Sequence, residues 1–212
     1  LPINETSKNK LLDELKRYSY TNDANPDSSV IRNYLQTVIS LPWGVLSEDE
    51  TDLKKVKKHM DLKHFGLEEV KTRILEFLAI KKNNPDINAP IICLVGPPGV
   101  GKTTFGMSLS EALNRKFYKI SVGGLNDASE LVGHKRTYLG SSPGKIIQGL
   151  KKCGTQNSVI LIDEIDKMVC DYKGDPASIL LDILDQNQNH TFIDNYIEEP
   201  FDLSKIIFIL TA

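Results

Sequence analysis

The chain has 212 residues, of which 40% are hydrophobic and 25% charged, and its formal net charge is −2. This composition is typical of a globular protein and excludes the disordered, collagen-like and disulfide-knot classes. The small negative charge gives no support for DNA binding. Apolar runs such as IICLV fall far short of the roughly 20 residues that span a bilayer, and the first ten residues lack the apolar core of a signal peptide. We therefore expect a protein that is neither secreted nor inserted in a membrane.

The cysteines are Cys93, Cys153 and Cys170, an odd number without a CxxC pair. We interpret them as structural thiols in a reducing compartment, with Cys93 packed as a small apolar residue.

Residues 1–43 are predicted to be a helical region at the end of an N-terminal part of the protein. Apolar residues recur at helical spacing from Leu11 to Tyr18 and again from Val30 to Ile39, separated by a polar break. Pro42 ends the second stripe, and Trp43 marks the expected boundary.

Residues 44–88 are predicted to form a second helical segment. The stretch DLKKVKKHM carries five basic residues, and either a nucleic-acid contact or a solvated helix face would explain them. The solvated face is favoured, because Leu53, Val56 and Met60 supply a buried side that the lysine stems can cover. The next helix is expected over residues 67–81, with these residues on one face: Leu67, Val70, Ile74, Phe77 and Leu78.

Residues 89–212 are predicted to form an α/β domain, a parallel sheet with helices on both faces. Short apolar runs alternate with helical patterns here, and the first run reads as a strand buried on both faces. The expected strands are 90–95, 116–122, 158–163 and 205–210. The expected helices cover 102–113 and 143–152 and begin again at Pro176, after the capping residue Asp175.

A phosphate-binding loop is predicted at residues 96–103, GPPGVGKT, which fit G-x-x-x-x-G-K-[ST] between a buried strand and a helix. Its glycines allow backbone N–H groups to face phosphate oxygens, and the helix N-terminus adds a positive dipole end. Lys102 is expected to reach the β- and γ-phosphates, and the Thr103 hydroxyl to bind Mg²⁺. The predicted contacts are Gly96, Pro97, Pro98, Gly99, Val100, Gly101, Lys102 and Thr103.

An acidic pair, Asp163 and Glu164, ends the apolar run SVILID. We expect this strand to lie beside the phosphate-loop strand, so that Asp163 holds the Mg²⁺ shell and Glu164 takes a proton from the attacking water. The base-reading motif N-K-x-D of GTPases is absent from the sequence. ATP with Mg²⁺ is therefore the expected ligand.

These motifs resemble the AAA+ ATPases, and longer strings resemble one family among them, the Lon-type ATP-dependent proteases. The strings include VIRNYLQTVISLPWG, HFGLEEVKTRILEFLAIKK, RTYLGSSPGK and GDPASILLDIL, and the likeness extends over nearly the whole chain. The resemblance implies an AAA+ P-loop fold that uses ATP hydrolysis to unfold protein substrates and move them into a peptidase chamber. It also implies a homo-oligomer, a hexameric ring, in the bacterial cytoplasm or the mitochondrial matrix.

The resemblance also assigns an adenine-side segment: His64, Phe65, Gly66 and Leu67. The alternative for this segment is a plain helix start with a buried phenylalanine.

Substrate-gripping roles follow from the same resemblance. Tyr138 and Leu139 match the pair that grips the substrate polypeptide, and turn-forming neighbours suggest that Tyr138 is exposed; the alternative is a packed loop tyrosine. Tyr172 lies where a second gripping loop would be. Phe192, Ile193, Tyr196 and Ile197 are expected in a hairpin to which we assign no chemistry.

The chain ends within an apolar strand pattern at Ala212, so we expect it to be part of a longer protein. By the resemblance, the sensor residues, the arginine finger, the helical lid and the Ser–Lys peptidase domain would follow Ala212. Two other functions stay open: an AAA+ motor that acts on DNA, and a nucleotide-binding module that does not hydrolyse its ligand.

Overall fold

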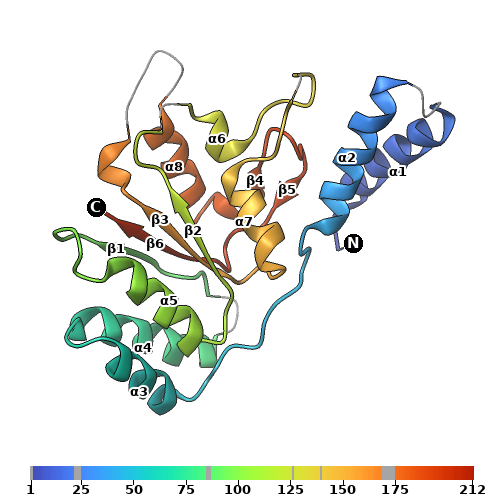
Figure 1. Ribbon diagram of the computed structural model, residues 1–212. Coiled ribbons are helices and arrows are strands. Elements are labelled where there is room, and N and C mark those ends of the chain that lie inside the picture. Colours follow the sequence, from blue (N-terminus) through green and yellow to red (C-terminus); the bar gives the residue numbers. More distant parts are fainter. Residues whose placement is uncertain (1, 22–24, 85–86, 126, 139, 169–174) are drawn as a thin grey trace.

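The structure is a computed structural model of the chain (Figure 1). It describes residues 2–21, 25–84, 87–125, 127–138, 140–168 and 175–212.

Four parallel strands form the central sheet, which confirms the predicted α/β fold. In chain order they are β1 (Ile91–Leu94), β2 (Phe117–Ser121), β3 (Val159–Asp163) and β6 (Ile207–Thr211). Their spatial order is β1–β6–β3–β2, with Cys93 opposite Leu210 and Ile162 also opposite Leu210. The expectation that the acidic strand adjoins the phosphate-loop strand was therefore wrong, because β6 lies between them.

Helices cover both faces of this sheet (Figure 1). Along β3, Val159 and Leu161 point to one face while Ile160 and Ile162 point to the other, as the strand period of two requires. The first face packs against α3 (Leu53–Lys63), α4 (Glu68–Asn83) and α5 (Lys102–Ala112). The second packs against α6 (Ser129–Val132), α7 (Lys145–Cys153) and α8 (Pro176–Leu184).

The N-terminal residues form two helices, α1 (Glu5–Tyr20) and α2 (Pro26–Ser40), as predicted. Buried side chains of α2, together with Leu41 and Trp43, pack into the hydrophobic core on the second face of the sheet. Trp43 lies where these helices meet that core. The Trp43 ring lies 4.8 Å from that of Phe201, and its indole N–H donates to the Val38 carbonyl at 2.7 Å. The small elements on this side are η1 (Ile165–Lys167), η2 (Asn189–Thr191), β4 (Phe192–Ile193) and β5 (Pro200–Phe201). Strands β4 and β5 pair antiparallel, which confirms the hairpin.

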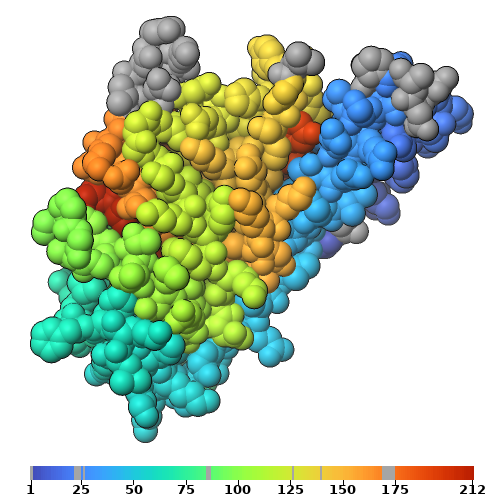
Figure 2. Space-filling model, viewed as in Figure 1, coloured from blue at the N-terminus to red at the C-terminus, as the bar shows by residue number. Residues whose placement is uncertain are grey.

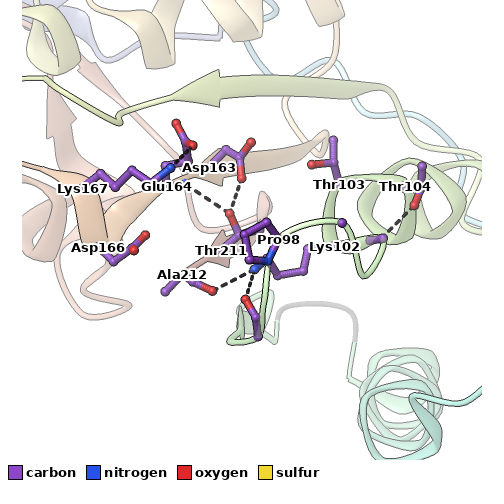
Figure 3. Close-up of a pocket in the computed structure, with 13 residues that line it drawn as sticks. Pro98, Lys102, Thr103, Thr104, Asp163, Glu164, Asp166, Lys167, Thr211 and Ala212 are labelled. Carbon is purple, nitrogen blue, oxygen red and sulfur yellow. Dashed lines mark hydrogen bonds and ion pairs between the residues drawn. The ribbon is translucent and has the colours of Figure 1, made fainter.

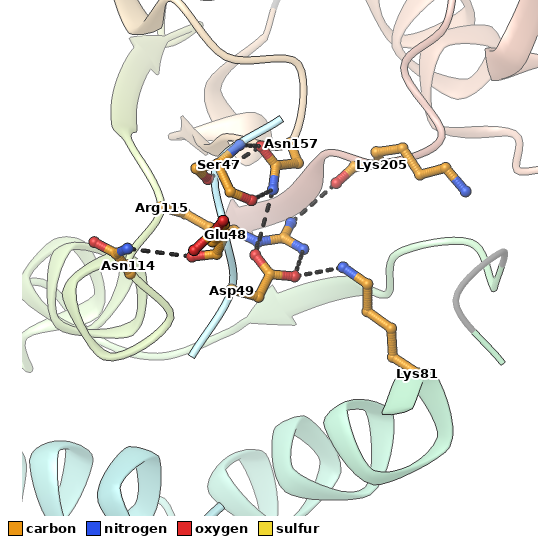
Figure 4. Close-up of polar contacts among 8 residues, drawn as sticks. All are labelled: Ser47, Glu48, Asp49, Lys81, Asn114, Arg115, Asn157 and Lys205. Carbon is orange, nitrogen blue, oxygen red and sulfur yellow. Dashed lines mark hydrogen bonds and ion pairs between the residues drawn. The ribbon is translucent and has the colours of Figure 1, made fainter. Parts of the chain in front are cut away.

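Residues 47–49, which follow Trp43, are bound by polar side chains at the end of the sheet where β2 and β3 begin (Figure 4). Arg115, which is 5% exposed, donates two hydrogen bonds of 2.7 Å to the Asp49 carboxylate. Lys81 of α4 binds the same carboxylate, and Asn157 accepts the Ser47 N–H at 2.8 Å. Burial alone would raise the pKa of Asp49, but the bonds from Arg115 and Lys81 lower it. The domain boundaries after residues 43 and 88 stay predictions.

Three local expectations were wrong. Strand β1 is not buried on both faces: Cys93 is exposed, since β1 pairs with β6 and lies at the edge of the sheet that the structure describes. The expectation that Cys93 packs as a small apolar residue was therefore also wrong. Helix α7 begins at Lys145 and not at Pro143, because Gly144 has an extended backbone (φ −66°, ψ 163°) and is the N-cap; its N–H is bound by the Asp194 carboxylate at 2.7 Å. Cys153 is buried, whereas Cys170 lies outside the described residues. Within those residues, no helix combines the length and apolarity needed to cross a membrane.

Candidate functional site

The glycine-rich loop joins β1 to α5 at the carboxyl edge of the sheet. Gly99 and Gly101 have φ angles of 83° and 90°, in the left-handed region that glycine enters at little cost. Gly101 is the N-cap of α5 and no side chain caps its first N–H groups. The loop thus presents an open helix N-terminus, which favours a bound anion.

A cavity of about 400 Å³ opens between this loop and the ends of β3 and β6 (Figure 3). Its walls are Gly96, Pro98, Gly99, Gly101, Lys102, Thr103, Thr104, Asp163, Glu164, Asp166, Lys167, Thr211 and Ala212. The structure therefore brings six of the eight predicted loop residues together with both predicted carboxylates. Pro97 and Val100 belong to the loop but do not line the cavity.

Lys102 carries the positive charge on the loop side of the cavity. Its ammonium group donates to the carbonyl oxygens of Gly96, Pro97 and Ala212, the last at 3.0 Å. In the part of the chain that the structure describes, no Asp or Glu side chain forms an ion pair with Lys102, although its charge acts on Asp163. A cation without a carboxylate partner beside an open helix N-terminus suits a phosphate group.

Asp163 ends β3, and its carboxylate already has partners. The Thr211 hydroxyl donates to one oxygen, and the Lys119 ammonium pairs with the other at 2.5 Å. Burial would raise the pKa of Asp163, but the hydrogen bonds from Lys119 and Thr211 and the charge of Lys102 lower it. A carboxylate with a lowered pKa is a poor proton acceptor. Asp163 is therefore better suited to binding a cation or a polar group than to acting as a general base.

Glu164 follows Asp163 in a strained conformation. Its φ is 65°, a region that non-glycine residues seldom adopt and that is often found at functional sites. The side chain is 40% exposed, pairs with Lys167 at 2.5 Å and lies 3.5 Å from the Ser121 hydroxyl. Its backbone N–H donates to the Thr211 hydroxyl at 3.2 Å. Glu164 is thus held at the cavity wall with its carboxylate open to solvent, as a general base requires.

Gly123, just beyond β2, lies directly against Glu164. A Cβ atom at this position would overlap the Glu164 carboxylate oxygen and would lie 3.1 Å from the Glu164 Cβ. An alanine here would therefore push the Glu164 side chain out of its place.

We expect Gly123→Ala to lower ATP turnover by about 10²-fold, the size of effect that a displaced catalytic group produces, while ATP binding is kept. Steady-state phosphate release and nucleotide titration measure the two effects. The double variant with Glu164→Gln should be no slower than Glu164→Gln alone, because both changes act on one side chain. Fully additive losses would show that Gly123 acts elsewhere.

Sequence reasoning missed Thr211 and Lys119. Both lie on strands that flank β3, and each contacts Asp163. Each is a polar residue inside or at the end of an apolar run, and parallel strands end at the same edge of a sheet. These two facts could have marked both residues as candidates for the site. Their pairing with Asp163 needed the strand order, which the sequence does not state.

The adenine-side segment lies outside the cavity walls, against α5. The His64 ring shares a 2.9 Å hydrogen bond with the Ser108 hydroxyl, and the buried Lys71 donates to the His64 carbonyl at 2.9 Å. Phe65 is fully exposed, so the alternative of a buried phenylalanine was wrong. Leu67 was wrongly placed on the buried helix face: it is 43% exposed, because it caps α4 with φ 56°. Gly66 beside it also has a positive φ, 77°.

Tyr138 lies far along the chain from these groups, on the loop between α6 and α7. Its side chain is 63% exposed, so the alternative of a packed tyrosine was wrong. Leu139 and Tyr172 lie outside the described residues. The gripping roles of all three residues stay predictions.

Comparison with known proteins gives a consistent result. Residues 92–212 match the family described as ATPase family associated with various cellular activities (AAA). A Lon protease of Clostridioides difficile is 54% identical over 208 residues, which are 98% of this chain and 26% of that protein. Lon protease 1 of Bacillus subtilis is 52% identical over 205 residues, 97% of this chain and 26% of that protein. The Lon protease of Halothermothrix orenii is 48% identical over 212 residues, 100% of this chain and 27% of that protein.

The chain therefore spans about a quarter of the length of the curated relatives it matches. The likeness to Lon-type proteases expected from the sequence is confirmed along nearly the whole chain. The family match covers the phosphate loop, the acidic pair and, apart from Ile91 at the start of β1, the strands of the central sheet. With the cavity at the carboxyl edge of that sheet, this match shows that the chain belongs to the AAA family of ATPases.

Proposed function

We propose that this chain binds and hydrolyses ATP with Mg²⁺, as the motor of a Lon-type ATP-dependent serine protease. One observation carries the proposal: a single cavity joins the phosphate loop, with the Lys102 cation, to the acidic end of β3. ATP hydrolysis needs both halves, a cradle for the phosphates and a carboxylate that activates water.

The residues present fit a magnesium–nucleotide ligand. Among the described residues, no group of three or more His, Cys, Asp and Glu side chains could hold a metal ion alone. Mg²⁺ commonly takes one or two protein oxygens and completes its shell with substrate phosphates and water. Thr103 and Asp163 line the cavity and would supply those oxygens. When bound, Mg²⁺ neutralises charge that develops on the phosphates.

The protein's own groups divide the work around the phosphates. The loop N–H groups and Lys102 bind and orient them, because both are positive and face the cavity. Glu164 accepts the proton of the attacking water, because its side chain is 40% exposed even though it pairs with Lys167. Asp163 is only 16% exposed and is bound by both Lys119 and Thr211. The segment from His64 to Leu67 packs on the adenine, with the exposed Phe65 as the ring available for stacking.

The process that ATP hydrolysis drives is inferred from the relatives, whose names describe them as Lon proteases. We propose a homo-oligomer, a hexameric ring, that acts on protein substrates in the bacterial cytoplasm or the mitochondrial matrix. Tyr138, with Leu139 and Tyr172, is proposed to grip the substrate chain. An exposed aromatic ring suits this role, because apolar contact with a polypeptide requires no particular sequence.

Tyr138→Ala in the full-length protein tests the proposal. Wild type should degrade a stably folded protein only with ATP. The variant should bind ATP and cleave a short unstructured peptide normally, yet lose degradation of the folded protein, because only that step requires pulling. Gel assays of the folded substrate and fluorescence assays of the peptide measure the two activities.

Two results would contradict the proposal. ATP-independent degradation of the folded protein by wild type would remove the motor function. Normal degradation of the folded protein by the variant would remove the gripping role from Tyr138. A matched control is Tyr20→Ala, since Tyr20 is also an exposed tyrosine, at 89% against 63% for Tyr138, but lies on α1.

A further inference from the structure

The loop that carries Tyr138 is fastened at both of its ends to the β4–β5 hairpin. At the near end, the Asn195 N–H donates to the Val132 carbonyl at 2.7 Å, and the Asn195 amide donates to the Gly133 carbonyl at 3.1 Å. At the far end, the buried Asp194 carboxylate accepts the Gly144 N–H at 2.7 Å. The hairpin, to which the sequence assigned no chemistry, is thus the base of this loop.

Arg136 forms a third attachment, two residues before Tyr138. Its guanidinium donates to Glu14 of α1 at 3.0 Å and to Glu198 of the hairpin at 2.6 Å. It also lies 4.0 Å above the ring of Tyr34, on α2. One side chain therefore joins the loop to both N-terminal helices and to the hairpin.

The same three parts are tied to one another without the loop. The Tyr34 hydroxyl donates to the Ile197 carbonyl at 3.2 Å, and the rings of Tyr34 and Tyr196 meet edge to face at 6.2 Å. Burial raises the pKa of Tyr34 to about 12, so this hydroxyl keeps its proton and its hydrogen bond. Ser7 of α1 binds the buried Glu199. Helices α1 and α2 and the hairpin therefore form one support.

Arg136 and Tyr138 differ in exposure, so the two residues can have different roles: Arg136 attaches the loop, and Tyr138 is free to contact a substrate. The Arg136 side chain is 24% exposed and its partner Glu14 is 20% exposed, whereas Tyr138 is 63% exposed. The Tyr138 N–H donates to the Lys135 carbonyl at 3.1 Å, so the exposed ring stands on a turn that includes Arg136. In Figure 2 the yellow surface of this loop lies beside the blue helices.

We propose that Arg136 is a positioning residue, which holds the Tyr138 loop against α1, α2 and the hairpin so that pulling force on Tyr138 is borne by this support. The proposal rests on the proposed function, since it concerns the loop that grips the substrate. It assigns to the N-terminal helices a role in force transmission and to the hairpin the role of a fixed base.

The chemistry requires arginine at this position. A guanidinium can donate in two directions from one plane and stack on an aromatic face at the same time. A lysine ammonium is a point charge that could pair with Glu14 or Glu198 but would not also stack on Tyr34. Arg136→Lys should therefore restore only part of what Arg136→Ala removes.

The experiment compares five forms of the full-length protein: wild type, Arg136→Ala, Arg136→Lys, Glu14→Gln and, as a matched control, Lys135→Ala. Lys135 is the neighbouring cation, but its side chain is exposed. Hydrogen exchange of the His134 and Tyr138 amides, which donate to Ser142 and Lys135, reports how firmly the loop is held. Folded-substrate degradation, peptide cleavage and ATP turnover are measured on the same samples.

We expect these amides to exchange at least about tenfold faster in Arg136→Ala, because losing even one hydrogen bond to a charged group corresponds to about a factor of ten and this change removes two. The kcat for the folded substrate should fall and the ATP consumed per molecule degraded should rise, while ATP turnover and peptide cleavage stay near wild type. Glu14→Gln and Arg136→Lys should show smaller changes of the same kind. Lys135→Ala should match wild type.

Unchanged exchange or unchanged folded-substrate degradation in Arg136→Ala would overturn the proposal. So would a parallel loss of ATP affinity, peptide cleavage and thermal stability in Arg136→Ala and Arg136→Lys, because a purely structural residue gives that pattern. Tyr138→Ala separates this proposal from the proposed function. If Tyr138→Ala degrades the folded protein normally, the gripping role fails, while hydrogen exchange still decides whether Arg136 holds the loop.

Discussion

Replacing Glu164 by glutamine is expected to leave ATP bound and to slow its hydrolysis by about 10²- to 10⁴-fold, the usual cost of a lost general base. The amide has nearly the shape of the carboxylate, so the strained backbone at φ 65° and the bond from the Glu164 N–H to Thr211 should persist. What disappears is the ability to accept a proton from water. Phosphate release and nucleotide titration on the full-length protein measure the two properties separately.

Two further variants serve as a comparison and as a control for Glu164→Gln. Asp163→Asn should first alter the Mg²⁺ concentration needed for turnover, because Asp163 is the expected metal-side carboxylate. Asp182→Asn on α8 makes the same carboxylate-to-amide change at an exposed position and should behave as wild type. Lost ATP binding with a normal residual rate in Glu164→Gln would mean that Glu164 serves the structure and not the reaction.

Lys102→Ala is expected to weaken ATP binding by about 10- to 100-fold, the equivalent of one hydrogen bond to a charged group, and to abolish hydrolysis. The ammonium group faces the cavity and is bound to carbonyl oxygens, so its charge is available to phosphate. Without this ammonium group, only the partial positive charges of the loop N–H groups remain to bind the phosphates. Titration with ATP and with ADP should show the larger loss for ATP, which carries the γ-phosphate.

Lys151→Ala is the matched control, because Lys151 is an exposed lysine on α7 on the other face of the sheet. Equal ATP affinity and turnover in wild type and Lys102→Ala would refute the phosphate assignment. Wild-type protein that binds ATP without turning it over would instead favour the alternative of a non-hydrolysing module.

Most helices and strands, and the polar residues at their ends, could be predicted from the order of neighbouring residues alone. The run from Val159 to Ile162 is apolar throughout, so a central strand was its only stable place in the fold. Asp175 before Pro176 marked the start of α8, and the Asp175 carboxylate does accept the Ala177 N–H at 3.0 Å. The phosphate loop was equally visible, because glycine spacing and one lysine suffice to define it. Such signals depend on neighbours within a few residues.

Which of these residues come into contact was determined by the tertiary structure. The sheet order inserts β6 between β1 and β3, which exposes Cys93 and places Thr211 against Asp163. The contact of Arg136 with Glu14 joins residues 122 positions apart. No local pattern encodes such pairings, because they follow from how the sheet, its helices and the hairpin pack together.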